Sequence, residues 1–158
     1  MKRNVKLRTM TLPVRRWLAA VSLAVAGASA HADCWSDAES RYAVSRFLLL
    51  AIAQNESGLN PSSVHRNADG TVDIGLMQIN SAWLPVLGRY GIGPGQLRDP
   101  CTNLQVGAWI LANDFAVYGR NWRAVGAYNA KNERLRIRYA RRVAQRFRSI
   151  AHEYGISR

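Results

Sequence analysis

The chain reads V-S-R-F-L-L-L-A-I-A-Q-N-E-S-G-L-N-P from Val44 to Pro61, and this stretch predicts a helix that ends at a carboxylate. Its apolar residues recur at helical spacing, at Val44, Phe47, Leu48, Ala51 and Ile52. Glu56 follows Ile52 by four residues, so its carboxyl belongs to the same apolar stripe, in the last turn. Ser57-Gly58 and Asn60-Pro61 then predict the helix end, because Gly just past a helix and Pro shortly after it are frequent stop signals.

The position of Glu56 predicts a carboxyl that holds its proton. Partial burial and the negative end of the helix dipole both disfavour the ionised form, so both raise the pKa of this group. A carboxylic acid that stays protonated near neutral pH is suited to general-acid catalysis. The plain alternative is a solvated glutamate at a helix end, since most glutamates lie on the surface.

Two later segments bring amide and hydroxyl groups into apolar surroundings. Residues 65–80 read H-R-N-A-D-G-T-V-D-I-G-L-M-Q-I-N, in which Asp69-Gly70 predicts the turn of a β-hairpin. The second half of this segment places Gln78 among apolar residues, and residues 127–130 read A-Y-N-A. His65 lies in the loop after the first helix without metal-ligand spacing, so the sequence predicts neither a metal site nor a cofactor.

The motifs E-S-G-L-N-P, G-L-M-Q-I-N and A-Y-N-A, in this order, resemble the signature of the lytic transglycosylases with a lysozyme-like fold. The chain is most similar to the small periplasmic members that accompany type IV secretion systems, type III secretion systems and pilus machines. The resemblance covers Cys34 to Val143. It implies a mainly α fold, of the α+β lysozyme-like kind, with a small β-hairpin. It also implies peptidoglycan glycan strands as the substrate and a secretion-system or pilus component as a partner.

The family to which this resemblance points uses one carboxylate, whereas most glycosidases use two. The resemblance implies that Glu56 protonates the glycosidic oxygen between N-acetylmuramic acid and N-acetylglucosamine. The ionised glutamate then removes the proton of the 6-hydroxyl of the muramic acid, whose oxygen closes on C1. The product is a 1,6-anhydro sugar, and no water is consumed. The tethered nucleophile gives the reaction an entropic advantage.

The resemblance also assigns roles to residues that follow Glu56 in the motifs. Ser57 is expected to orient the carboxyl or to contact a substrate peptide or acetamido group. Gln78 is expected to hydrogen-bond the sugar, and Met77 to shape the pocket.

Three residues near the end of the chain complete the implied site. Tyr128 and Asn129 are expected to line the groove, with Tyr128 near the catalytic carboxyl. Tyr139, in Y-A-R-R-V, is similar to the last tyrosine motif of the family, which holds that carboxyl by a hydrogen bond. For both tyrosines the alternative is core packing in which only the hydroxyl finds a partner.

Two other functions remain open from the sequence. A hydrolytic lysozyme of the same fold needs a second carboxylate to activate water, and Asp69 and Asp73 lie in the hairpin expected to face Glu56. The D-G turn explains Asp69 but not Asp73. The third hypothesis is a non-catalytic module that docks on the wall or on a secretion machine, against which the intact Glu56, Gln78 and Tyr128 argue.

Residues 1–30 predict a secretory signal peptide that is cleaved after Ala30 or Ala32. Six basic residues precede an apolar run from Trp17 to Ala26, and two overlapping A-x-A frames follow it. The run is too short for a stable membrane span, and an uncleaved anchor is the alternative. The segment predicts export to the periplasm of a Gram-negative bacterium.

Charge and length describe the mature domain, residues 33–158. The 158-residue chain has a formal net charge of +12, from 22 basic and ten acidic residues. The signal peptide holds six of the basic residues and no acidic one, so 16 basic and ten acidic residues remain, a net charge of +6. Nucleic-acid binding therefore loses most of its support from charge. About 125 residues remain, enough for one domain with one core.

The two cysteines, Cys34 and Cys101, predict one disulfide in an exported chain. Such a bridge closes a long loop and contributes about 4 kcal/mol in the chain-entropy model. The alternative is two free thiols.

Helical signals fill the second half of the chain. Asp99-Pro100 predicts a helix start, residues 119–121 predict its end, and helices over Trp122–Tyr128 and Glu133–Tyr154 follow. The apolar face of the last helix comprises Tyr139, Val143, Phe147, Ile150 and Tyr154, and its basic residues include Arg136, Arg141, Arg142, Arg146 and Arg148. This basic face is either solvated or attracted to wall polymers, an anionic membrane surface or a partner protein.

Overall fold

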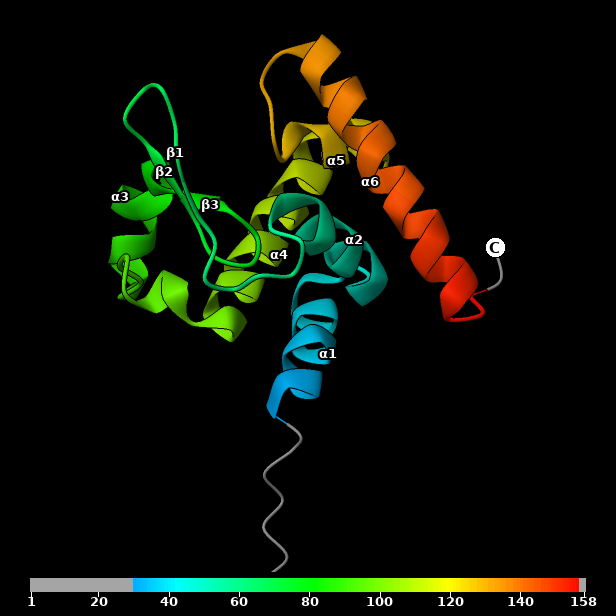
Figure 1. The fold of residues 1–158 in the computed structure, drawn as a ribbon, viewed down its shortest axis with the longest axis horizontal. Coiled ribbons are helices and arrows are strands. Elements are labelled where there is room, and N and C mark those ends of the chain that lie inside the picture. Colours follow the sequence, from blue (N-terminus) through cyan, green and yellow to red (C-terminus); the bar gives the residue numbers. More distant parts are fainter. Residues whose placement is uncertain (1–29, 157–158) are drawn as a thin grey trace, which may run out of the picture.

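The computed structural model describes residues 30–156, and most of the predicted signal peptide lies outside these residues. The chain folds into helices and one small sheet (Figure 1). The helices are α1 (Ala30–Tyr42), α2 (Arg46–Glu56), α3 (Leu84–Leu87), α4 (Pro100–Tyr118), α5 (Trp122–Ala127) and α6 (Glu133–Glu153), and the strands are β1 (Val64–Arg66), β2 (Val72–Ile74) and β3 (Ile79–Asn80). The mainly α fold with a small β element is confirmed.

Helix α4 runs through the centre of the molecule. Figure 1 shows the sheet and α3 on one side of it and α5 and α6 on the other. The core follows this helix, where Leu104, Ala108 and Leu111 are buried together with Leu49 and Ile52 of α2. The long apolar face of α4 thus explains why two lobes, one made by the sheet with α3 and the other by α5 with α6, share one core.

The predicted helix before Glu56 is confirmed, with one change in its buried face. Ile52 and Ala51 are buried as expected, whereas Leu48 is only half-buried and Leu49 is fully buried. The helix ends at Glu56, with Ser57 as the capping residue. The carboxylate therefore lies where the spacing places it, in the last turn.

The predicted hairpin is confirmed and has a third strand beside it. Strands β1 and β2 pair antiparallel, with Val64 opposite Ile74, and β3 adds to the other edge of β2. In the turn, Asp69 Oδ1 accepts hydrogen bonds from the N–H of Thr71 at 3.0 Å and from its hydroxyl at 2.6 Å. These bonds give Asp69 the turn role that the D-G pair predicts.

The last helix departs from its prediction at two places. Tyr154 does not continue the buried stripe, because it is 58% exposed. Its ring is tilted by 54° against that of Phe47, with 5.5 Å between the ring centroids. Of the predicted basic face, Arg141, Arg142 and Arg148 are exposed. Arg146 is half-buried, and the Arg136 side chain is only 12% exposed, so Arg136 does not belong to a solvated face.

The predicted disulfide is confirmed between Cys34 of α1 and Cys101 in the first turn of α4. It joins two residues that are 67 positions apart, which corresponds to about 4 kcal/mol in the chain-entropy model. Within residues 30–156, no helix combines the length and the apolar character that a bilayer crossing requires.

Candidate active site

Glu56 receives a hydrogen bond from the hydroxyl of Tyr139. The two residues are 83 positions apart in the sequence, and they meet because α6 packs along α2. Tyr139 is 1% exposed, whereas Glu56 is partly buried and keeps an open side. A carboxyl at a helix end is thus held from one side by a fixed donor.

Burial raises the pKa of Glu56 above the usual range of a glutamate. The hydrogen bonds from Tyr139 and Asn55 favour the ionised form and act in the opposite direction, but burial outweighs them. The negative charge of Asp73 adds to the rise, and the positive charge of Arg142 reduces it. The predicted direction of the pKa shift is confirmed, and its largest cause is desolvation.

Asn103 of α4 anchors the segment from Gly75 to Asn80 by hydrogen bonds. Its side chain is fully buried. Its Oδ1 accepts the N–H of Met77 at 2.7 Å, and its Nδ2 donates to the carbonyls of Ile74 and Leu97, each at 2.8 Å. A Cβ on Gly75 would lie 2.5 Å from this Nδ2, and Gly75 has a φ of +79°, so only glycine fits there. Sequence reasoning missed Asn103.

Ser57 ties the end of α2 to this segment. Its hydroxyl donates to the carbonyl of Leu76 at 2.7 Å, so it fixes the backbone next to Glu56. The side chain of Met77 is fully buried in the core, and its carbonyl accepts the hydroxyl of Tyr128 at 2.9 Å. Met77 therefore contacts the site through its backbone.

Gln78 has a left-handed backbone, with a φ of +49°. Such a conformation is uncommon for a residue with a side chain and is found repeatedly at functional sites. Its Nε2 donates to the carbonyls of Gly75 at 2.8 Å and of Ser63 at 3.2 Å. Neither bond uses the side-chain carbonyl oxygen, so this acceptor is available to a ligand.

Tyr128 and Tyr139 lie against each other, with ring centroids 6.4 Å apart and planes 21° from parallel. Burial raises the pKa of both phenols well above the usual range, so each hydroxyl remains a neutral donor. Asn129 follows Tyr128 and is exposed. The structure thus gathers Glu56, Ser57 and the two tyrosines at one place, with Asn129 on the adjoining loop.

Asp73 is held by two amides. Its Oδ2 accepts from Asn67 Nδ2 at 2.9 Å, and its Oδ1 accepts from Asn80 Nδ2 at 2.7 Å. Asn80 also caps a short 3-10 helix, Ser81–Trp83, where its Oδ1 accepts the N–H of Ala82 at 2.8 Å. Asp73 is near enough for its charge to raise the pKa of Glu56, but both of its oxygens already have partners.

Within residues 30–156, the site included, no three His, Cys, Asp or Glu side chains are grouped so that they would hold a metal ion. His65 is exposed on β1.

On the sequence-based hypothesis that Glu56 is a general acid, replacing Tyr139 with phenylalanine is expected to move the pH profile of glycan cleavage. Loss of the hydroxyl removes a donor that favours the ionised carboxylate, so the pKa of Glu56 rises further. Because the general acid works in its protonated form, the descending limb of the rate profile should move to higher pH. A hydrogen bond to a charged group contributes about 1.5–3 kcal/mol, so we expect kcat to fall about tenfold or more. Tyr90→Phe, at an exposed tyrosine, is the control, and an unshifted limb in Tyr139→Phe would contradict the prediction.

Comparison with known proteins identifies a related family. The family model described as transglycosylase SLT domain matches residues 33–149. The chain is 44% identical over 127 residues to invasion protein IagB of Salmonella typhimurium strain LT2, covering 77% of this chain and 79% of that protein. It is 41% identical to protein IpgF of Shigella flexneri, over 77% of this chain and 84% of that protein. It is 37% identical to the X polypeptide of Escherichia coli K12, with coverage of 90% and 89%.

Two solved structures share the fold at a TM-score of 0.65 each. One is the 70 kDa soluble lytic transglycosylase of Escherichia coli, 24% identical over 80% of this chain. The other is an inactive mutant of the lytic transglycosylase Slt of Pseudomonas aeruginosa, 19% identical over 83% of this chain. The chain spans about a quarter of the length of each, at 25%.

Proposed function

The chain belongs to the transglycosylase SLT family, and we therefore propose that it is a peptidoglycan lytic transglycosylase. It would cleave the β-1,4 bond between N-acetylmuramic acid and N-acetylglucosamine and leave a 1,6-anhydro-N-acetylmuramic acid end. The observation that carries this proposal is the partly buried Glu56, whose pKa is raised and whose carboxyl is held by Tyr139. Such a group is a general acid by its environment.

The reaction needs one carboxyl that gives and then takes a proton. Protonated Glu56 donates to the glycosidic oxygen, the bond to C1 breaks, and positive charge develops at C1. The carboxylate then accepts the proton of the 6-hydroxyl, whose oxygen forms a bond to C1. Tyr139 keeps the carboxyl at one position through both transfers, and its hydrogen bond favours the intermediate carboxylate. The nucleophile belongs to the sugar itself, so proximity lowers the barrier.

Amide and hydroxyl groups surround the acid in this proposal. Gln78 offers its side-chain oxygen to the sugar. The exposed Asn129 contacts the sugar from the opposite lobe. Ser57 and Met77 act on the site by fixing the backbone beside Glu56, and Tyr128 by its contact with Tyr139. We thus assign sugar binding to Gln78 and Asn129 and positioning of the site to the other three residues.

The rival function is hydrolysis, with Asp73 as the residue that activates water. Its negative charge adds to the rise in the pKa of Glu56, which makes it the candidate second carboxylate. Each of its oxygens, however, accepts an amide hydrogen bond from Asn67 or Asn80, which gives it a structural role in the sheet. A carboxylate that must also activate a water would do better with an open oxygen, and this supports the one-carboxylate mechanism.

The sugars released from purified peptidoglycan by residues 33–158 test the proposal. We expect mass spectrometry to find muropeptides that end in 1,6-anhydro-N-acetylmuramic acid, and we expect Asp73→Asn to leave the identity of this product unchanged. Reducing-end N-acetylmuramic acid from the wild-type chain would instead assign the hydrolase. No release of sugars would favour the docking module.

We propose that the protein acts in the periplasm and opens the wall locally for a secretion system or pilus. The predicted signal peptide and the Cys34–Cys101 disulfide support export. The resemblance of its motifs to the secretion-associated members of the family supports the role beside such a machine, and one relative, from Salmonella typhimurium, bears the name of an invasion protein.

A further inference from the structure

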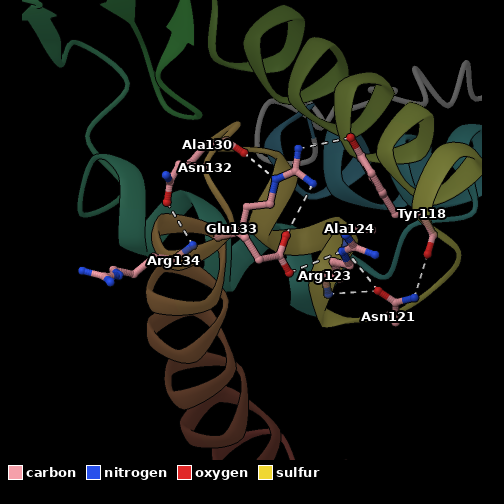
Figure 2. Close-up of polar contacts among 9 residues, drawn as sticks. Tyr118, Asn121, Arg123, Ala124, Ala130, Asn132, Glu133 and Arg134 are labelled. Atoms are coloured by element: carbon pink, nitrogen blue, oxygen red, sulfur yellow. Dashed lines mark hydrogen bonds and ion pairs between the residues drawn. The ribbon is translucent and has the colours of Figure 1, made fainter.

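Arg136 lies near the start of α6, and only 12% of its side chain is exposed. Figure 2 shows Tyr118, Ala130 and Glu133 directed toward one place, between the end of α4, the loop after α5 and the first turn of α6. Arg136 contacts all three. Its Nε donates to the carbonyl of Ala130 at 2.8 Å, and its Nη2 donates to the hydroxyl of Tyr118 at 3.1 Å.

The guanidinium is also fixed in orientation. It lies over the ring of Tyr118, with 4.7 Å between Cζ and the ring centroid, and its Nη1 is 4.0 Å from the carboxylate of Glu133. Glu133 is shared with Arg123, at 3.4 Å. A planar group with donors in two directions and a stacking face suits this position, whereas an ammonium group would supply one point of contact.

The backbone at Arg136 is in direct contact with α5. A Cβ on Gly126 would lie 2.6 Å from the carbonyl oxygen of Arg136 and 2.8 Å from its Cβ, so glycine is needed where the two helices meet. Gly126 in turn accepts the N–H groups of Asn129 at 3.4 Å and Ala130 at 3.3 Å. Backbone packing and the guanidinium therefore act on the same short loop.

This loop carries the groove residues of the proposed function. Ala130, whose carbonyl Arg136 binds, is the next residue after Asn129 and the second after Tyr128. Tyr139, which holds Glu56, is one helical turn after Arg136 on α6. Arg136 thus connects the A-Y-N-A loop to the helix that positions the acid.

One more group needs the positive charge of Arg136. Asp114 of α4 is half-buried, and burial raises its pKa to about 6, while the charge of Arg136 lowers it. Its buried Oδ2 has no hydrogen-bond partner among the described residues. A lysine at position 136 keeps the charge beside Asp114 and removes only the fork of donors, so this substitution isolates geometry from charge.

We propose that Arg136 is a positioning residue of the transglycosylase site, which sets the loop 128–132 relative to Glu56 through its bonds to Ala130 and Tyr118. The inference rests on the proposed function, because the loop matters for catalysis only if Tyr128 and Asn129 serve the glycan. Arg136 itself touches no reacting atom.

The test compares Arg136→Lys with Arg141→Lys, a matched change at an exposed arginine on the same helix. Initial rates on soluble glycan strands give kcat and KM, and hydrogen exchange reports the protection of amides in residues 128–132. We expect Arg136→Lys to lower kcat about tenfold or more at a Tm close to wild type, and to raise loop exchange. Arg141→Lys should change neither. Tyr118→Phe keeps the ring but removes one acceptor, and we expect kcat about threefold lower.

Each outcome decides between the two proposals. If the wild-type chain cleaves the glycan and Arg136→Lys has the same kcat and the same loop exchange, the positioning role is overturned and the proposed function stands. If Arg136→Lys does not fold, Tyr118→Phe decides, and wild-type kcat in that variant overturns the role. If the wild-type chain releases no sugar, the proposed function and the catalytic part of this inference are both contradicted. Faster loop exchange in Arg136→Lys would then still support the contact between Arg136 and the loop.

Discussion

Glycan cleavage should fall by at least about a thousandfold when Glu56 is replaced by glutamine, because general acid and base catalysis both disappear with the carboxyl. The amide is nearly isosteric, so Tyr139 can still donate to its oxygen and the fold stays intact. The rate of anhydro-muropeptide release measures the effect. Glu153→Gln, at an exposed glutamate on α6, is the control for loss of a negative charge.

The same substitution should stabilise the fold at neutral pH. The pKa of Glu56 is raised in the folded chain, so ionisation costs stability. This cost is absent below the pKa of the unfolded chain and grows as the pH rises through the folded pKa, so the gain of Glu56→Gln should appear above that range and vanish in acid. Near wild-type cleavage by a folded Glu56→Gln variant would refute the assignment of Glu56 as the acid.

Removing Asn103 should cause the largest loss of stability, because three backbone groups depend on one buried side chain. Asn103→Ala removes the side-chain partner of the N–H of Met77 and of the carbonyls of Ile74 and Leu97. A buried unsatisfied group costs about 1–3 kcal/mol, so we expect a loss of at least about 3 kcal/mol in the free energy of unfolding. Urea titration of the purified chain measures it.

A matched control lies on the same helix. Asn113 is exposed and donates only to the carbonyl of Trp109, at 2.9 Å, so Asn113→Ala should change stability by about 0.5 kcal/mol or less. If both alanine variants lose equal stability, the buried network does not hold the segment as described. If only Asn103→Ala is destabilised, cleavage should also fall in the folded fraction, because the Met77 carbonyl positions Tyr128.

Elements with a local signal were predictable from the sequence. Apolar spacing and stop signals place the end of α2 at Glu56, Asp99-Pro100 begins α4, and Asp69-Gly70 forms the hairpin turn. In each case the residues that determine the structure are neighbours in the sequence. The resemblance to a family supplied the hydrogen bond between Tyr139 and Glu56, which no local pattern contains.

Features that depend on distant segments were not predictable in this way. Asn103 lies on an apolar helical face, and its role depends on distant backbone groups such as the N–H of Met77, 26 residues earlier. The helical pattern assigned Arg136 to a solvated basic face, because nothing in the pattern shows that Tyr118 and Ala130 supply acceptors. Similarly, β3 is only two residues long, and its pairing with β2 is accompanied by a side-chain bond from Asn80 to Asp73 that the sequence pattern does not show.

The distance of 83 residues between Glu56 and its donor also fixes when the site is completed. A chain that has emerged only as far as α5 contains the carboxyl and the sheet, but the tyrosine that holds the carboxyl is still missing. Closing a loop of this length has an entropic cost, which the packing of α6 along α2 must offset before the contact can form. Under the proposed function, the catalytic carboxyl therefore gains its fixed donor only once the last helix has packed along α2.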